Sequence, residues 1–291
     1  MAPASLRLTA RAKINLYLHI TGRRADGYHL MDSLVCFAEL GDELTILPGE
    51  KLSLALEGPF APSLAGADNL VLRAARLIDP AHGAALALNK QLPVAAGIGG
   101  GSADAAAALI GLSRHWDAPM PSAAEVLKLG ADLPVCLADG PTFVGGIGED
   151  LAAAPLLPAT YLVLANPRRP LPTVDVFRGY AKTSAGFFST PARWSHVPRD
   201  AAGLADLLRE RGNDLTEPAI ALVPEIGQLL TAIDASPGCL LARMSGSGAS
   251  CFGLFGAAEA AAKAAAMLQV MSPNWWIRAS AIATGGAVAG L

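Results

Sequence analysis

A glycine-rich segment near the middle of the chain is the clearest chemical feature of the sequence. Residues 93–109 read PVAAGIGGGSADAAAAL, where four of the five residues from 97 to 101 are glycine and an alanine-rich run follows. Glycines at this density cost backbone entropy, so they indicate a tight turn whose N–H groups converge on an anion. A helix that begins there adds its own unpaired N–H groups and its dipole. The segment predicts a phosphate cradle with Ser102 as the helix cap; the alternative is a turn that only lets a strand pack against a small-residue helix.

Two common nucleotide-binding motifs do not describe this cradle. A dinucleotide fingerprint needs a third glycine at the position of Ser102, and a Walker A loop needs a lysine at its end, where this chain has none. The cradle is therefore of another kind.

Lys13 and Asp132 have the side chains that phosphoryl transfer needs. Lys13 and Asn15 share one face of the alternating segment 7–20, which is typical of a half-buried strand. The alternative for that face is simple exposure to solvent. Asp132 has apolar neighbours, and a carboxylate is seldom buried alone, so it either caps a turn or meets a cation. A Lys–Asp pair beside a γ-phosphate can activate an alcohol and stabilise the transferred group.

A second glycine-rich turn comes late in the chain. Residues 245–250 read SGSGAS and separate two apolar strand-like segments. The alternatives are a further part of a phosphate or substrate site and a plain hairpin turn.

Composition limits the classes of protein that need considering. The chain has 291 residues, of which 52% are hydrophobic and 16% charged, with a formal net charge of −3. No basic cluster interleaves with aromatic residues, so we expect no nucleic-acid partner. Mean hydropathy is +0.39, but the longest uncharged apolar stretch, 151–167, contains three prolines and predicts no membrane span. Four scattered cysteines and the lack of an apolar leader favour the cytoplasm.

Strands and helices are mixed without a strict βαβ alternation, which favours an α+β protein with two lobes. The lobe boundary is expected near residues 150–158. Period-2 and apolar segments predict strands at 7–20, 34–38, 43–47, 51–56, 84–92, 142–145, 161–165, 239–244, 251–255 and 276–281. Capping residues and helical spacing predict helices at 68–78, 103–115, 122–128, 173–180, 201–211, 224–233 and 257–270.

Three motifs together resemble those of the GHMP small-molecule kinases. They are Arg11-Ala-Lys-Ile-Asn15, the glycine-rich segment that begins at Pro93, and Met244-Ser-Gly-Ser-Gly-Ala249. Their order and spacing extend over nearly the whole chain. The resemblance implies a two-lobed α+β fold, with an N-lobe like domain 2 of ribosomal protein S5 and a ferredoxin-like C-lobe. It also implies an ATP-binding N-terminal domain at 1–153 and a C-terminal domain at 154–291.

Three further segments are similar to those of one family within that group, the 4-diphosphocytidyl-2-C-methyl-D-erythritol kinases. These segments are Gly22-Arg-Arg-Ala-Asp-Gly-Tyr-His29, Gly130-Ala-Asp-Leu-Pro-Val135 and Asn213-Asp-Leu215. The resemblance implies that ATP phosphorylates the 2-hydroxyl of a CDP-linked methylerythritol. The alternatives are a GHMP kinase for another small alcohol such as mevalonate, and a catalytically silent nucleotide-binding protein on the same fold. We expect a monomer or a homodimer.

The resemblance also assigns residues. It implies a catalytic pair, Lys13 and Asp132. ATP would be held by Asn69, Lys90, Pro93, Gly97, Gly99, Gly100, Gly101, Ser102 and Ala103, with Lys90 and Asn69 near the nucleoside. The CDP-linked alcohol would be held by Asn15, Tyr28, His29, Thr173, Phe177, Gly246 and Gly248, with His29 on the cytosine edge. ATP implies Mg²⁺, but no acidic residue matches the metal-binding Glu of some relatives. Either Ser102 contacts the ion, or ATP carries it largely hydrated.

Overall fold

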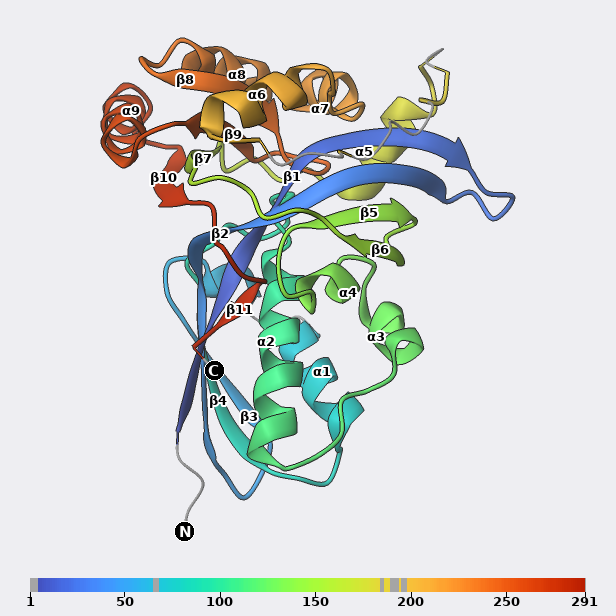
Figure 1. The fold of residues 1–291 in the computed structure, drawn as a ribbon. Coiled ribbons are helices and arrows are strands. Elements are labelled where there is room, and N and C mark those ends of the chain that lie inside the picture. Colours follow the sequence, from blue (N-terminus) through green and yellow to red (C-terminus); the bar gives the residue numbers. More distant parts are fainter. Residues whose placement is uncertain (1–4, 65–67, 184–185, 189–193, 195–197, 291) are drawn as a thin grey trace.

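The structure, a computed structural model, describes residues 5–64, 68–183, 186–188, 194 and 198–290. Two sheets organise these residues, and a long hairpin runs between them (Figure 1). The strands of the hairpin are β1 (Leu6–Arg23) and β2 (His29–Pro48), paired antiparallel from Leu6 opposite Ile46 to Arg23 opposite His29.

The first sheet has the strand order β11-β1-β2-β4-β3, and β5 and β6 extend it from the far part of β2. The remaining strands of this sheet are β3 (Ser53–Glu57), β4 (Ala84–Asn89), β5 (Thr142–Gly146), β6 (Asp150–Ala153) and β11 (Val288–Ala289). All the pairs are antiparallel except β3 with β4.

A layer of helices, some before the glycine-rich segment in the chain and some after it, covers one side of this sheet (Figure 1). They are η1 (Ala61–Leu64), α1 (Leu70–Ile78), α2 (Gly100–His115), α3 (Ala123–Leu129) and α4 (Leu133–Cys136). The alanine-rich α2 lies at the centre of the layer and packs on β1 and β2. Small side chains let this helix approach the sheet closely: a Cβ on Gly111 would come 2.4 Å from Ile46 Cδ1.

The second sheet has the order β10-β7-β9-β8 and is antiparallel throughout. Its strands are β7 (Tyr161–Asn166), β8 (Cys239–Met244), β9 (Cys251–Phe255) and β10 (Trp276–Ala281). Its helices are α5 (Thr173–Tyr180), α6 (Ala201–Arg209), α7 (Thr216–Leu222), α8 (Glu225–Asp234) and α9 (Ala258–Met271). With helices between β7 and β8 and α9 between β9 and β10, this is the β-α-β-β-α-β arrangement of ferredoxin-like folds.

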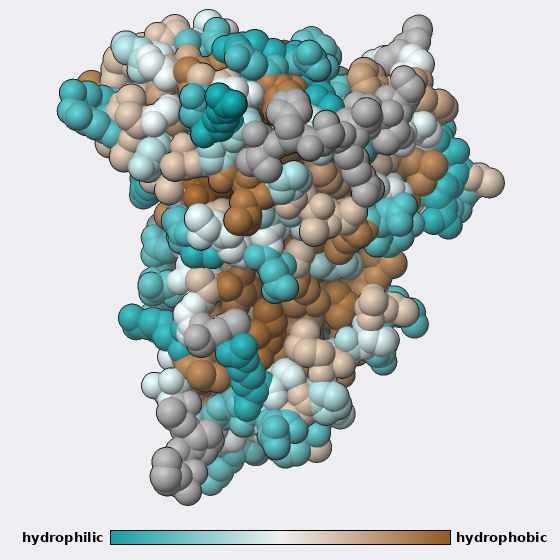
Figure 2. All heavy atoms as spheres, in the orientation of Figure 1, coloured by the Kyte–Doolittle hydropathy of each residue, from teal (hydrophilic) through white to brown (hydrophobic). Residues whose placement is uncertain are grey.

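Both faces of the second sheet are covered, which explains why β7 is a continuous apolar run rather than an alternating one. Val163 and Ala165 face the core beneath α8 and α9. Leu162 and Leu164 face another core that contains Ile14 and other residues of β1 and β2. That shared core fixes the second sheet against the hairpin. On the outer surface, hydrophilic residues cover the helices at the upper end of the view, while hydrophobic residues gather in its middle (Figure 2).

The structure corrects three of the expectations about elements. The expected strands 34–38 and 43–47 are one strand, β2, because the chain stays paired with β1 through Gly41, where a Cβ would come 2.3 Å from Ala10 O. The expectation of a half-buried strand at 7–20 is wrong for its second half, where residues 12–20 are buried on both faces. Five short elements, η1, α4, β6, α7 and β11, were not expected. Among the described residues no helix combines the length and the apolar character needed to cross a bilayer.

Candidate active site

One cavity of about 1000 Å³ collects almost all of the residues that the sequence singled out. It lies where the glycine-rich segment, β1, the hairpin end, α5 and the second glycine turn meet. Of the predicted residues, its wall includes Lys13, Asn15, Tyr28, His29, Asn69, Lys90, Pro93, Gly97, Gly99, Gly100, Gly101, Ser102, Asp132, Thr173, Phe177 and Gly246. Ala103 and Gly248 do not line it. Ala103 is fully buried in α2, and Gly248 lies behind the wall, where a Cβ would come 2.7 Å from Met244 Sδ.

The cradle is the first turn of α2. Gly99 occupies the N-cap in a left-handed conformation, with φ 61°, and its carbonyl accepts the N–H of Ala103 at 2.9 Å. The N–H groups of residues 100–102 precede that first helical bond, so they are available to an anion. Ser102 is therefore not the cap that the sequence predicted. A left-handed turn suits glycine at the N-cap, which moves Ser102 one turn into the helix, where it still lines the cavity.

Both neighbours of the cradle hold it through hydrogen bonds to its backbone carbonyl oxygens. On one side the N–H of Lys13 donates to Ile98 O at 2.9 Å. On the other side Ser245 Oγ donates to Gly97 O at 3.0 Å, and Ser250 N donates to Ala96 O at 3.0 Å. The second glycine turn is thus more than a plain hairpin turn, because it packs directly against the first.

Lys13 and Asp132 meet on the cavity wall. Lys13 Nζ donates to Asp132 Oδ1 at 2.7 Å, and the two side chains differ in exposure, with 5% for Lys13 and 51% for Asp132. Exposure of Lys13 to solvent, the alternative for its strand face, is excluded. Asp132 sits at the N-cap position of α4 but makes no side-chain cap bond. Its carboxylate therefore binds the ammonium of Lys13 rather than the helix, and Asp132 lines the cavity.

Asn15 presents an unused acceptor to the same cavity. Its Nδ2 donates to Ser33 Oγ at 2.8 Å, and its backbone N–H donates to Ser245 Oγ at 3.1 Å. Asn15 Oδ1 is buried and has no hydrogen-bond partner among the residues that the structure describes. A buried acceptor without a partner costs stability, so this atom is suited to a donor on a ligand such as a hydroxyl.

Lys90 lines the cavity, but its ammonium is not free for a nucleoside. Lys90 Nζ donates to Asp42 Oδ2 at 2.5 Å and to Asp104 Oδ2 at 2.6 Å, and all three side chains are buried. Asp42 Oδ1 also accepts the N–H groups of Gln91 at 2.6 Å and Leu92 at 2.8 Å. Lys90 thus belongs to a buried ion cluster beneath the cradle, and its expected place near the nucleoside stays a prediction.

The pKa shifts within this cluster follow from its burial. Although burial alone lowers the pKa of Lys90, Asp104 and Asp42 outweigh it and hold that pKa above its ordinary value. Burial raises the pKa of Asp104 to about 8, against the opposing attraction of Lys90. The cluster therefore sets the ammonium of Lys90 against two carboxyl groups beneath the cradle.

Two predicted nucleotide residues sit where α1 begins and where the glycine-rich segment begins. Asn69 is the N-cap of α1, and its Oδ1 accepts the N–H of Val71 at 2.9 Å. Pro93 is buried on the cavity wall. Asn69 Nδ2 has no part in the cap bond and can face a nucleoside.

Aromatic rings gather around His29 at the end of the hairpin. The rings of His29 and Phe177 are 5.3 Å apart and inclined by 28°, and Tyr180 meets His29 edge-on at 5.8 Å. Thr173 precedes Phe177 by one turn of α5, and its Oγ1 lies 2.9 Å from Ser247 Oγ. Tyr28 is 62% exposed, so its ring face is open. Burial and the charge of Arg23 lower the pKa of His29, which keeps the imidazole neutral at pH 7 and able to read a base edge.

A divalent cation could be held by Ser102 and Asp132, which both line the cavity. In the part of the chain that the structure describes, no three His, Cys, Asp or Glu residues are grouped for a metal ion. A hydroxyl, one carboxylate and the phosphates of a nucleotide nevertheless suit Mg²⁺, which keeps several waters and needs few protein ligands. The residues present therefore fit a largely hydrated ion.

Sequence reasoning missed Asp42, Asp104 and Ser247. Asp104 has a recognisable signal, because it is the one charged residue in the run 103–110 of α2, and a carboxylate in an apolar helix requires a partner. Asp42 and Ser247 give no comparable signal, since both lie in polar, glycine-containing segments.

Comparisons with known proteins agree with this geometry. The model of the GHMP kinases N terminal domain matches residues 69–148, and that of the GHMP kinases C terminal domain matches residues 193–272. A 4-diphosphocytidyl-2-C-methyl-D-erythritol kinase of Cereibacter sphaeroides is 55% identical over 277 residues, which cover 92% of this chain and 96% of the relative.

Solved structures give the same fold. The crystal structure of a 4-(cytidine 5'-diphospho)-2C-methyl-D-erythritol kinase superposes with a TM-score of 0.76 at 32% identity, covering 96% of this chain and 99% of that one. L. major mevalonate kinase in complex with R-mevalonate has a TM-score of 0.66 at 14% identity and covers 96% of both chains; that likeness concerns the fold alone. The predicted two-lobed α+β fold is confirmed, and the chain belongs to the GHMP kinases and, within them, to the family of 4-diphosphocytidyl-2-C-methyl-D-erythritol kinases.

Proposed function

We propose that this chain transfers the γ-phosphoryl group of ATP to the 2-hydroxyl of 4-diphosphocytidyl-2-C-methyl-D-erythritol, a step of the non-mevalonate route to isoprenoid precursors. The observation that carries the proposal is the Lys13–Asp132 pair, 2.7 Å apart, on the wall of a cavity that also holds the cradle, His29 and Phe177. The names of the relatives support the same reaction.

The protein's part in the transfer is to position the reactants and to balance charge. The N–H groups of residues 100–102 bind phosphate oxygens at the start of α2, where the helix dipole favours an anion. Asp132 accepts the proton of the alcohol as it attacks, and Lys13 stabilises the negative charge of the phosphoryl group. Asn15 Oδ1, which is buried and has no hydrogen-bond partner within the described part of the chain, orients a hydroxyl of the alcohol.

Mg²⁺ belongs to this proposal as the companion of ATP, with Ser102 as the residue that would hold it while Asp132 serves as the base. When bound, the ion neutralises charge on the phosphates. The cluster beneath the cradle places the ammonium of Lys90 there, between Asp42 and Asp104.

The cytosine would be recognised at the hairpin end. Neutral His29 hydrogen-bonds the base edge, and Phe177 and Tyr28 offer ring faces to the base. Thr173, Gly246 and Ser247 would line the path of the diphosphate between the base and the reacting hydroxyl. Gly248 would act indirectly, through the packing of that turn.

Each of the two alternative functions considered from the sequence leaves a group of residues in the cavity without a role. A kinase for a small alcohol such as mevalonate has no role for the group around His29 and Phe177, and its likeness to this chain in fold does not choose a substrate. A silent nucleotide-binding protein has no role for the Lys13–Asp132 pair.

The setting of the reaction is part of the proposal. All four cysteines are free thiols, three of them buried, which suits a reducing compartment and supports a cytoplasmic enzyme. We expect the small molecules to be its only required partners, with no nucleic acid or membrane, and the chain to act as a monomer or homodimer.

A substrate panel tests the proposal. ADP release is measured with the CDP-linked alcohol and, at equal concentrations, with mevalonate, homoserine and galactose, and phosphorus NMR locates the new phosphate on the product. The proposal predicts turnover with the CDP-linked alcohol at least about a hundredfold above the others, since a hydrogen-bonded and stacked base adds several kcal/mol. Equal or better turnover with another alcohol would overturn it.

A further inference from the structure

The segment Asn213–Leu215 resembles family members in sequence, yet the reaction as derived gives it no role. It lies between α6 and α7 and runs beside β1, far away in the chain. Leu18 N donates to Gly212 O at 3.0 Å, and Asp214 N donates to Leu18 O at 2.9 Å. Two backbone bonds therefore dock this segment on the strand that carries Lys13 and Asn15.

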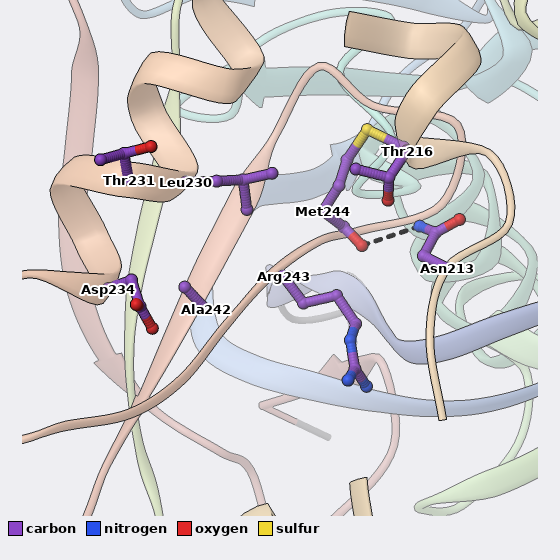
Figure 3. Close-up of a pocket in the computed structure, with 8 residues that line it drawn as sticks. All are labelled: Asn213, Thr216, Leu230, Thr231, Asp234, Ala242, Arg243 and Met244. Atoms are coloured by element: carbon purple, nitrogen blue, oxygen red, sulfur yellow. Dashed lines mark hydrogen bonds between the residues drawn. The ribbon is translucent and has the colours of Figure 1, made fainter. Parts of the chain in front are cut away.

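The Asn213 side chain holds the second glycine turn. Asn213 Nδ2 donates to Met244 O and to Gly246 O, each at 2.8 Å, and the first of these bonds is drawn in Figure 3. Asn213 Oδ1 accepts the N–H of Leu215 at 3.0 Å. Both amide hydrogens and the acceptor are thus in use, which fixes the orientation of the carboxamide.

Asp214 and His19 keep Asn213 in place. Gly212 N–H donates to His19 Nε2 at 3.2 Å, so that nitrogen carries a lone pair and the proton is on Nδ1. Nδ1 donates to Asp214 Oδ1 at 3.0 Å, while Asp214 Oδ2 accepts Ile20 N–H at 2.7 Å. Phe188 stacks on the buried ring of His19 at 3.8 Å. The segment that carries Asn213 therefore has little conformational freedom.

The turn that Asn213 holds faces the alcohol side of the cavity. A Cβ on Gly246 would lie 3.3 Å from Asn15 Oδ1, and Ser247 Oγ is 2.9 Å from Thr173 Oγ1. All four residues line the cavity. Moving the carbonyl of Gly246 would therefore shift the surface next to the acceptor of Asn15.

We propose that Asn213 is a positioning residue for the alcohol substrate: its two amide donors fix the carbonyls of Met244 and Gly246 and so align the second glycine turn with Asn15 and Thr173. The proposal rests on the proposed function, because it concerns the binding of that alcohol. ATP depends less on Asn213, because Asn213 fixes the carbonyls of Met244 and Gly246, whereas the second turn holds the cradle through Ser245 Oγ and Ser250 N. The first turn of α2 is also held by its own helix and by Lys13 N–H.

Two variants separate positioning from general loosening. Asn213→Ala removes both donors, and Asn213→Asp keeps the shape but sets a carboxylate against two carbonyls. Each variant should raise KM for the CDP-linked alcohol about tenfold or more and lower kcat, because buried acceptors lose their partners. The dissociation constant of ATP should stay within about twofold of the wild-type value.

The pH dependence of Asn213→Asp gives a second readout. Repulsion by the carbonyls raises the pKa of the new carboxyl group, and its protonated form regains one donor. The ratio of its KM to the wild-type KM should therefore fall as the pH is lowered from 8 to 6. A loosened fold would not recover in this way, and a variant that folds poorly at pH 8 can still be compared at pH 6.

Thr216→Val is the matched control. Thr216 lines the same small cavity of about 420 Å³ as Asn213 (Figure 3), but its side chain makes no hydrogen bond that the structure records to the turn. It should leave both constants unchanged. Turnover of the CDP-linked alcohol by the wild type is the reference. If the wild type does not turn over this alcohol, the proposed function fails. If the wild type does turn over this alcohol, an unchanged KM in both Asn213 variants, or a parallel loss of ATP binding, would overturn the positioning role of Asn213.

Discussion

Gly97 and Gly246 lie so close together that neither position has room for a side chain. A Cβ on Gly246 would come 2.9 Å from Gly97 O, and a Cβ on Gly97 would come 2.6 Å from the carbonyl oxygens of Ser245 and Gly248. Both glycines also have positive φ angles, 73° for Gly97 and 55° for Gly246. The phosphate cradle and the second glycine turn therefore form one packed unit, although they belong to distant parts of the chain.

Gly246→Ala should disturb both substrates. The methyl group would press on Gly97 O and would hold alanine in a left-handed conformation, which costs about 1–2 kcal/mol before the clash is counted. We expect KM for the alcohol and the dissociation constant of ATP each to rise about tenfold, measured by steady-state kinetics and calorimetry. Gly256→Ala is the control, because a Cβ there meets only Ala201 Cβ at 4.0 Å. Normal constants in folded Gly246→Ala would contradict the packed unit.

The sequence predicts best where the signals are local. The bounds of α5, β8, β9 and β10 agree with the expected ranges because each segment has its own apolar pattern and its own turn residues. The apolar neighbours of Asp132 left a turn cap or a cation as its partner, and the family resemblance implied the pairing with Lys13 that the structure shows. The α+β class follows from the same kind of evidence.

Contacts between distant residues explain what the sequence could not predict. The ion cluster around Lys90 was not expected, because its carboxylate partners are 48 and 14 positions away and no local pattern joins them. The helix cap at Gly99 has a left-handed backbone conformation, and Lys13 leaves no room for a side chain at this position. A Cβ on Gly99 would come 2.9 Å from Lys13 Cβ. β11 forms only because β1 offers it a free edge.

Asp132→Asn tests the proposed base. The amide keeps the shape and can still lie beside Lys13, but it cannot accept the proton of the alcohol. We expect kcat to fall by roughly 10² or more while ATP binding persists. Asp139→Asn provides the comparison, since Asp139 is close in sequence and exposed but does not line the cavity. Turnover near the wild-type rate in folded Asp132→Asn would remove Asp132 from the mechanism.

Lys90→Met tests the ion cluster beneath the cradle. The substitution leaves Asp42 and Asp104 facing each other without their cation, and breaking a buried pair in this way costs about 3–5 kcal/mol. The melting temperature and the affinity for ATP should both fall, and adding Asp104→Asn should restore part of the melting temperature. Lys263→Met removes a lysine that is 76% exposed and paired only at the surface, so it should change neither. If Lys90→Met were as stable as that control, the cluster would have no structural role.

The pKa of His29 can be shifted without touching its ring. Burial and then the positive charge of Arg23 disfavour the imidazolium and lower the pKa from 6.5. Arg23→Gln should therefore raise the pKa toward the ordinary value, as followed by NMR titration of the ring. Arg24→Gln should have less effect, because Arg24 pairs with Asp26. Since the neutral ring is the one that reads the base, KM for the alcohol should stay level from pH 8 to 7 and rise only as His29 gains its proton in acid. An unchanged pKa in Arg23→Gln would contradict this account.

His29→Ala and Phe177→Ala address the choice of substrate directly. Each should raise KM for the CDP-linked alcohol about five- to a hundredfold, because a lost hydrogen bond or a lost stacking face costs about 1–3 kcal/mol. ATP binding should hardly change, since neither residue belongs to the cradle. The two rings touch at 5.3 Å, so the double variant should cost less than the product of the two single effects. An alcohol without cytosine should be a poor substrate of the wild type and should lose little more in either variant. If both variants kept the wild-type KM for the CDP-linked alcohol, the base would bind elsewhere, and the aromatic group around His29 would be ordinary packing of the hairpin against α5.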